Sequence, residues 1–224
     1  EKGDHDEAIA DYTEAIQRNP RSAEAYYNRG AAYGKKGECD RAVADYTETV
    51  KLNPELAEPY WGRGAAFIMQ GELDKAIADY SDAIRLNPKS ALAYCNRGFA
   101  YVNKSEPDQA IADYTEAIRL DPEYAEAHGN RGFAYHEKGE YDKAIADLTE
   151  AIRLKPDGAL ALVGRGTAYL HKGDLDKAVA DFTEAIRLAP DLPQPYSGRA
   201  AAYRALGDEE RAAADERKAK ELMN

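Results

Sequence analysis

The sequence has few of the residues that most often carry catalysis, metals or disulfide frameworks. Its 224 residues include two cysteines, four histidines, two methionines and one tryptophan. Cys39 and Cys95 fall in different copies of the repeat described below, so we expect no disulfide between them. Because no short ligand spacing such as HExxH occurs, the sequence predicts no metal site.

Positive charge is also scarce, as are long apolar runs. Lysine and arginine number 30 against 41 aspartate and glutamate, which gives a net charge of -11. This balance argues against nucleic acid or an anionic membrane as the general partner. No apolar run approaches the length of a membrane span, and the sequence shows no secretory signal. The absence of a signal indicates little, because the chain enters in mid-repeat. We expect a cytoplasmic location.

Repetition is what the sequence has in abundance. The stretch from Ala125 to Gly158 closely matches the 34 residues before it and the 34 after it. A fixed period of this length is typical of stacked repeat proteins. We therefore predict one array over residues 1–224, with a partial repeat at 1–22, complete repeats at 23–56, 57–90, 91–124, 125–158 and 159–192, and a last repeat at 193–224.

Each repeat has the pattern of two helices. The first carries Tyr26, Gly30 and Tyr33 in repeat 1, at spacings of four and three that lie on one helical face. It ends at a glycine turn such as KKGE (35–38). The second helix begins with an acid and ends with a base before proline, which suits the helix dipole. Since neither helix can bury its apolar face alone, we predict an all-α solenoid of thirteen stacked helices.

Aromatic residues indicate which faces are buried. Numbering each repeat from 1 to 34, with Ala23 as the first position 1, thirteen of the sixteen tyrosines fall at positions 4, 11 and 24. Stacking requires these faces, so we interpret the tyrosines as core residues rather than as a cofactor site.

These positions make the sequence similar to the tetratricopeptide repeat family, over the whole chain. Position 8 is Gly or Ala, position 11 is aromatic, position 20 is Ala and position 32 is Pro, as at Gly132, Tyr135, Ala144 and Pro156. The resemblance implies a right-handed superhelix that binds other proteins, with no catalytic residues and no cofactor. It also implies a concave face lined by positions 2, 5, 6, 9, 12 and 13 of the first helix.

Two positions depart from the family pattern. Position 7 is always Arg, as at Arg131, and position 23 is always Asp, as at Asp147. The shared period favours a ladder of ion pairs between helices. The alternative is that the arginines are presented to a ligand.

One turn and the two ends of the chain also differ from the other copies. Ser105 replaces the turn glycine in repeat 3, and Pro107 follows it, so we expect an altered and strained turn. The polar residues Glu216 and Lys220 indicate a C-terminal capping helix. At the other end, the chain enters in mid-repeat, and we interpret it as a fragment. We expect the helix over 5–19 to expose an apolar face made by Ala8, Ile9 and Tyr12.

Groove positions that vary between repeats are the candidates for recognition. Apolar and aromatic residues there would form a broken strip that anchors a partner. Asparagines at position 6 resemble the ladder that pairs with peptide backbones in the repeat domain of O-linked N-acetylglucosamine transferases. For the apolar strip the alternatives are tighter helix packing and contact with a second copy of the chain. For the asparagines the alternative is a bond to a neighbouring helix. The candidates are Tyr27, Asn28, Trp61, Ile68, Met69, Asn96, Phe99, Val102, Asn130, Phe133 and His136.

Enzymatic chemistry finds little support in these residues. His136 and His171 could approach each other near Glu137, but the sequence favours a solvated surface there. The lysines and asparagines of a chaperone-type carboxylate clamp are missing from positions 5 and 9. We therefore predict a scaffold that binds a peptide or partner segment. The alternatives are a non-catalytic targeting domain of a larger enzyme and a scaffold that self-assembles into a homo-oligomer.

Overall fold

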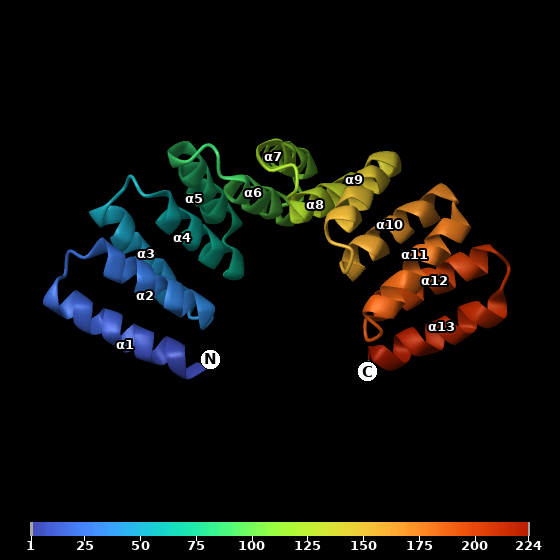
Figure 1. The fold of residues 1–224 in the computed structure, drawn as a ribbon, viewed down its shortest axis with the longest axis horizontal. Helices are drawn as coiled ribbons and strands as arrows, with labels where there is room; N and C mark the ends of the chain where they lie inside the picture. Colours follow the sequence, from blue (N-terminus) through green and yellow to red (C-terminus); the bar gives the residue numbers. More distant parts are fainter. Residues whose placement is uncertain (1, 224) are drawn as a thin grey trace. The chain divides into compact units, whose positions relative to one another are not determined.

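The computed structural model describes residues 2–223, with side chains from residue 5 onward. Over this range the chain forms thirteen α-helices and no strand (Figure 1), as the repeat pattern predicts. The first seven are α1 (Lys2–Arg18), α2 (Ala23–Lys35), α3 (Cys39–Leu52), α4 (Ala57–Met69), α5 (Leu73–Leu86), α6 (Ala91–Asn103) and α7 (Pro107–Leu120). The others are α8 (Ala125–Glu137), α9 (Tyr141–Leu154), α10 (Ala159–Lys172), α11 (Leu175–Leu188), α12 (Pro193–Ala205) and α13 (Glu209–Leu222).

Local sequence signals set where these helices begin and end. Ser22 and Ser90 cap α2 and α6, because their hydroxyls accept hydrogen bonds from the backbone N–H of Ala25 and Ala93. The turn between the two helices of a repeat contains a glycine with positive φ, such as Gly37 at 75°. Only glycine adopts this left-handed conformation without steric cost, so the turn residue decides where the first helix stops.

The turn of repeat 3 keeps the same geometry without glycine. Ser105 has φ 60° and is the one non-glycine residue with positive φ in the described chain. Its backbone N–H bonds to the Val102 carbonyl at 2.8 Å, as the Gly37 N–H bonds to Gly34 at 3.0 Å. The expectation of an altered turn was therefore wrong. Strain is present, because a side chain at this φ is sterically disfavoured.

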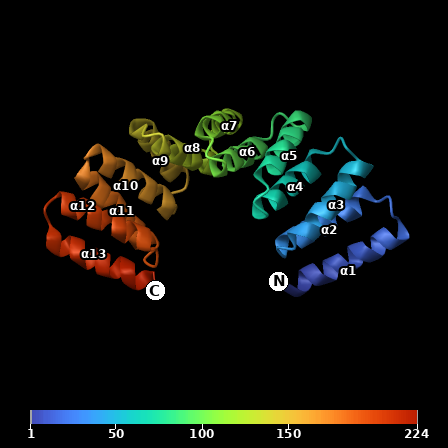
Figure 2. The ribbon, with the colours of Figure 1, turned by 180° about the vertical axis from the view of Figure 1, so that it is seen from behind.

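The chain divides into two compact blocks, residues 1–120 and residues 121–224. Within each block the two helices of a repeat run side by side in both views (Figure 1, Figure 2). First helices also contact the first helix of the next repeat, as α2 with α4 and α8 with α10, whereas described second helices make no such contacts with each other. The first helices therefore form the inner surface of each block. The single array over 1–224 stays a prediction.

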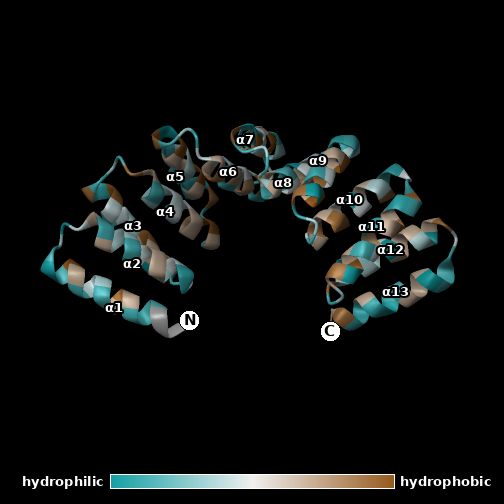
Figure 3. Cartoon of the chain, in the orientation of Figure 1, coloured by the Kyte–Doolittle hydropathy of each residue, from teal (hydrophilic) through white to brown (hydrophobic). Residues whose placement is uncertain are grey.

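The core consists of small residues that receive large rings. Ala42, Ala76 and Ala144 at position 20 are fully buried, as are the rings of Tyr114 and Phe182 at position 24. This confirms the predicted core role of position 24. Both helices of a repeat contribute residues to this core. Each helix carries hydrophobic and hydrophilic residues (Figure 3).

The end helices agree only in part with the expectations. Glu216 and Lys220 on α13 are exposed, and Glu216 pairs with Arg204 at 2.6 Å, as expected for a solvent-facing helix. On α1, however, Ala8, Ile9 and Tyr12 are half-buried rather than exposed. The reason is that α1 packs against α2, which covers part of each side chain.

Candidate functional site

A ladder of arginine–aspartate pairs joins the two helices of each of the five complete repeats and of the last repeat. Each guanidinium forms two parallel hydrogen bonds with one carboxylate, and in Arg165 these bonds are 2.8 Å long. The carboxylates are buried, with Asp181 7% exposed. The bond to Asp181 raises the pKa of the Arg165 guanidinium, while burial opposes this rise. The ladder prediction is confirmed, and the arginines serve packing. The pairs are Arg29–Asp45, Arg63–Asp79, Arg97–Asp113, Arg131–Asp147, Arg165–Asp181 and Arg199–Asp215.

The same arginines also reach back to the preceding repeat. Within the blocks, the third nitrogen donates to a hydroxyl at position 25, as from Arg63 to Thr47 at 3.1 Å and from Arg199 to Thr183 at 3.0 Å. The guanidinium therefore ties three helices together, which stacking alone does not require. Sequence reasoning missed this contact, although a hydroxyl recurs at position 25 in every repeat before the last.

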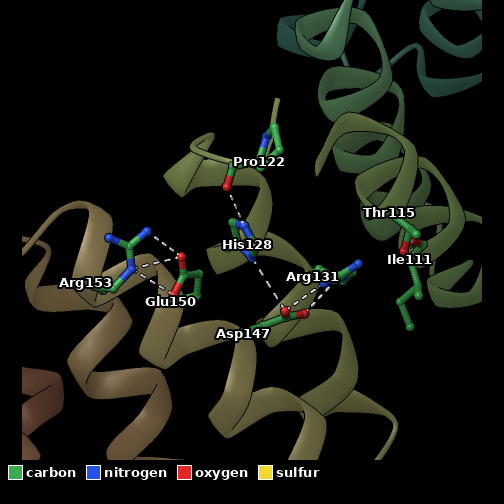
Figure 4. Close-up of polar contacts among 8 residues, drawn as sticks. All are labelled: Ile111, Thr115, Pro122, His128, Arg131, Asp147, Glu150 and Arg153. Atoms are coloured by element: carbon green, nitrogen blue, oxygen red, sulfur yellow. Dashed lines mark hydrogen bonds and ion pairs between the residues drawn. The ribbon is translucent and has the colours of Figure 1, made fainter. Parts of the chain in front are cut away.

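His128 stands at a position where other repeats have tyrosine, and it makes a similar contact (Figure 4). It occupies position 4, where Tyr60 and Tyr196 donate their hydroxyl to a proline carbonyl. Its Nε2 lies 3.1 Å from the Pro122 carbonyl oxygen, and its Nδ1 lies 3.6 Å from Oδ1 of Asp147. His128 is 8% exposed, so its side chain serves the core rather than a ligand.

The N-terminal block contains a groove on its inner surface, which we call the Trp61 groove. It has a volume of about 260 Å³ and lies between α4 and α6. Tyr27 and Trp61, two of the predicted binding residues, line it together with Glu58 and Leu92. Burial and the Glu58 carboxylate raise the pKa of Tyr27. The indole of Trp61 packs against Tyr60 and its neighbours in the core, so this side chain also stabilises the stack.

The C-terminal block contains a groove at the equivalent place, which we call the Gly129 groove. It has a volume of about 390 Å³ and lies between α8 and α10. The predicted residues Asn130 and Phe133 line it, beside Gly129 and Leu160. Phe133 is 38% exposed and Leu160 is 61% exposed, so apolar surface faces the solvent here.

The remaining predicted residues lie apart from these two grooves. Phe99 is 45% exposed on α6, and Ile68 and Val102 are half-buried. Met69 is 64% exposed and approaches the sulfur of Cys39 at 3.9 Å. Asn28 and Asn96 are half-buried.

His136 meets His171 across two first helices. Nε2 of His136 lies 3.0 Å from Nδ1 of His171, and the ring of Tyr141 stacks on His171. Burial and the neighbouring imidazole lower the pKa of His136. The sequence anticipated that these histidines could approach, but not that one imidazole would bond to the other.

Sequence reasoning missed three residues of the grooves. Leu92 and Leu160 stand at position 2, where repeats 1, 2 and 4 have glutamate, and they are 44% and 61% exposed. The change from acid to leucine was a signal for them. The signal for Gly129 was its place at position 5, which varies between repeats.

Two further observations concern metals and membranes. In the part of the chain that the structure describes, no group of three or more His, Cys, Asp or Glu side chains could hold a metal ion. None of the helices from Lys2 to Leu222 is long and apolar enough to cross a membrane. In the described chain, Cys39 and Cys95 form no disulfide with each other.

Stacked helix pairs with variable residues on the inner helices define the class of helical-repeat scaffolds. A family model for the TPR repeat matches residues 1–37 and 66–105. Two models for the tetratricopeptide repeat match residues 95–159 and 134–193, and residues 23–56. The chain belongs to the tetratricopeptide repeat family. This family is typically non-catalytic, and the chain is in general terms a protein-interaction scaffold.

Solved structures of this family resemble the chain closely in fold. A MamA protein is 31% identical, with a TM-score of 0.68 over 75% of this chain and 92% of that chain. YrrB, a TPR protein with an unusual peptide-binding site, is 24% identical, with a TM-score of 0.68 over 82% of this chain and 95% of that chain. A tetratricopeptide repeat protein from Parabacteroides merdae is 22% identical, with a TM-score of 0.76 over 99% of this chain and 88% of that chain.

Proposed function

We propose that the chain binds an extended peptide segment of a partner protein on the inner surface of its first helices. The observation that carries this proposal is the location of exposed apolar side chains. Leu92 and Phe99 on α6 and Phe133 and Leu160 on α8 and α10 are all exposed, and all stand at positions 2 or 9 of a first helix. Exposed aromatic and aliphatic anchors of this kind dominate binding at protein interfaces.

The polar residues of the same surface suit an extended backbone. The amides of Asn28 and Asn96 at position 6 can each donate and accept a hydrogen bond. Side-chain amides paired with a peptide backbone give affinity without reading its sequence. Because the helices are preformed, little ordering entropy is lost by the scaffold on binding. YrrB, which has a peptide-binding site, offers a parallel for this use of the fold.

Charge limits the class of partner. The net charge of -11 and the acids at position 2, Glu24, Glu58 and Glu126, disfavour an acidic segment. A neutral or basic peptide therefore complements the surface, and nucleic acid does not. The two other hypotheses, a targeting domain of a larger enzyme and self-assembly, stay predictions. Sedimentation over a range of concentrations tests the second, and a strictly monomeric species would contradict it.

The test is a selection of peptides from a random phage-displayed library, followed by fluorescence anisotropy with a labelled selected peptide. A Leu92→Ser/Phe99→Ser double variant should weaken binding by about tenfold or more, because it removes two anchors. Both side chains are exposed, so the fold should tolerate the change. The matched control is Met223→Ser, an exposed apolar residue at the end of α13. Unchanged affinity in the double variant would contradict the proposal.

A further inference from the structure

Most glycines inside the helices are required by packing. A Cβ added at Gly62 would lie 2.6 Å from the ring of Tyr46, and one at Gly164 would lie 2.4 Å from the ring of Phe133. At Gly198 the distance to the ring of Phe182 would be 2.5 Å. Contacts this short force a neighbouring ring to move, so glycine at these positions makes room for the rings.

Gly129 is different, because nothing in the fold requires it. The nearest atom to an added Cβ would be Cβ of Ala151 at 3.8 Å, an ordinary van der Waals contact. Glycine in the middle of a helix is nevertheless destabilising relative to alanine. Because Gly129 has no side chain where one would fit, the groove has space for a group from outside the chain.

The same position two repeats earlier shows what that space can hold. Position 5 is Trp61 in repeat 2 and Gly129 in repeat 4. Three alanines stand at equivalent positions in the two walls, Ala57, Ala83 and Ala93 in the Trp61 groove and Ala125, Ala151 and Ala161 in the Gly129 groove. In one block the three alanines line the groove together with an indole at position 5, and in the other block position 5 contributes no side chain. The larger volume of the Gly129 groove, about 390 Å³ against about 260 Å³, agrees with this.

The chemistry of the Gly129 groove indicates its ligand. Phe133 and Leu160 provide partly exposed apolar walls, which favour an aromatic side chain. At the rim stand Glu126, Asp157 and Lys155, and Lys155 lies 3.6 Å from Glu126. Because the rim has two acids and one base, a cation is favoured beside the aromatic group.

We infer that the Gly129 groove binds a large aromatic side chain of the partner peptide that has a lysine or arginine beside it. The inference rests on the proposed function and specifies one subsite of it. Gly129 provides the floor, since its missing side chain leaves the place of the Trp61 indole to the ligand. Phe133 and Leu160 contact the aromatic group, and Glu126 and Asp157 attract the cation.

The experiment uses small indoles as probes, so it does not depend on an identified partner. The chain is titrated with tryptamine, N-acetyltryptophanamide and indole-3-propionate, which carry positive, zero and negative charge, and backbone NMR shifts are followed. Shifts should centre on Gly129 and Leu160. The ammonium group of tryptamine would pair with the exposed acids at the rim, Glu126 and Asp157. Exposed pairs of this kind contribute little, so tryptamine should bind about threefold more tightly than indole-3-propionate.

Substitutions at position 5 decide whether the pocket itself is responsible. Gly129→Trp fills the shell as Trp61 does, and it should abolish the localised shifts while the far-ultraviolet circular dichroism stays unchanged. Gly129→Ala, which geometry tolerates, should weaken tryptamine binding and keep the fold. The matched control is Gly34→Ala in α2, where an added Cβ meets nothing within 4 Å, and it should leave binding unchanged.

The outcomes separate this inference from the proposed function. Equal binding of tryptamine to wild type and to a folded Gly129→Trp variant would overturn the inference. If indole-3-propionate bound more tightly than tryptamine, the preference for a lysine or arginine beside the aromatic group would be overturned. If no indole binds in the C-terminal block while selected peptides still require Leu92 and Phe99, the subsite is wrong and the proposed function stands. If selected peptides ignore Leu92 and Phe99 while tryptamine binds as described, the proposed function fails in its N-terminal part and the pocket remains.

Discussion

The Trp61 groove and the Gly129 groove occupy the same place in two different repeats. Their alanine walls match position by position, and each is bounded by an exposed leucine, Leu92 or Leu160. In the first groove the chain fills the shell with its own indole, which packs on the core. In the second it leaves the shell open. The comparison shows that position 5 of the repeat can carry a side chain that stabilises the stack or can leave space for a ligand.

The ladder should be the feature that the two blocks share most closely, and its loss should have the largest effect. Arg63→Leu in the N-terminal block and Arg165→Leu in the C-terminal block should each lower the free energy of unfolding by about 3–5 kcal/mol. Each leaves a carboxylate, Asp79 or Asp181, buried without its partner. Urea unfolding followed by circular dichroism measures the loss.

The control for the ladder is an exposed pair on a second helix. Arg85→Leu removes a contact with Asp82 in which the arginine side chain is 61% exposed. It should change stability by less than about 1 kcal/mol. A loss at Arg63 or Arg165 as small as that at Arg85 would show that the ladder does not stabilise the stack.

The next largest effect should come from emptying the filled groove. Trp61→Ala removes an indole that packs against the core cluster of Tyr60, Ala83, Ile84 and Ala93. Since the indole is partly exposed, we expect a loss of about 2–4 kcal/mol, toward the lower end of buried tryptophan truncations. Chemical unfolding measures this loss. A value below about 1 kcal/mol would mean that Trp61 serves the ligand alone and that the two grooves differ less than the packing indicates.

Two glycine to alanine substitutions within the C-terminal block should change the free energy of unfolding in opposite directions. Gly129→Ala should raise the free energy of unfolding by about 0.5–1 kcal/mol, because alanine is the better helix former and the site has room. Gly164→Ala should lower it by about 1–3 kcal/mol, because the new methyl group overlaps the ring of Phe133. Thermal unfolding compares the pair. The same sign in both variants would contradict the claim that Gly129 is free of packing demands.

The turns of repeats 3 and 4 offer a smaller comparison of the blocks. Ser105→Gly should raise stability by about 0.5–1 kcal/mol, because it relieves a side chain at φ 60°. Gly139→Ser, at φ 74° in the equivalent turn, should lower stability by a similar amount. Melting temperatures of the two variants should move in opposite directions. No rise for Ser105→Gly would show that the serine turn is unstrained.

The smallest effect concerns pH and the histidine pair of the C-terminal block. The equivalent residues at position 12 in the N-terminal block, Ile68 and Val102, do not titrate. The folded state holds the pKa of His136 below its usual value of about 6.5 through burial and His171, against the opposing charge of Glu137. A lowered pKa contributes stability that is present above pH 6.5 and is lost as the pH falls.

The melting temperature should therefore drop between pH 7.5 and pH 5.5 in the wild type. In His136→Gln the drop should be smaller, because glutamine stays neutral. Tyr141 on α9 and His171 on α10 face the same ring and stay in place in this variant. An identical pH dependence in wild type and variant would show that the pair does not couple to folding.

Much of the fold could be predicted because its signals are local and repeated. The helix pairs, the turn residues, the core role of position 24 and the pairing of Arg131 with Asp147 all follow from periodicity and charge. The turn at Ser105 was harder, because the sequence shows a missing glycine but not whether the backbone will tolerate serine at positive φ. The half-buried face of α1 depended on how closely α2 covers it.

The candidate site was less predictable, for a physical reason. The sequence alone determined which positions vary between repeats, and so which of them could face a ligand. Only the tertiary structure decided that the indole of Trp61 packs on the core, that Gly164 makes room for Phe133 and that Gly129 makes room for no residue of the chain. These differences depend on contacts between neighbouring repeats, where distances of a few tenths of an ångström separate a required glycine from an open pocket.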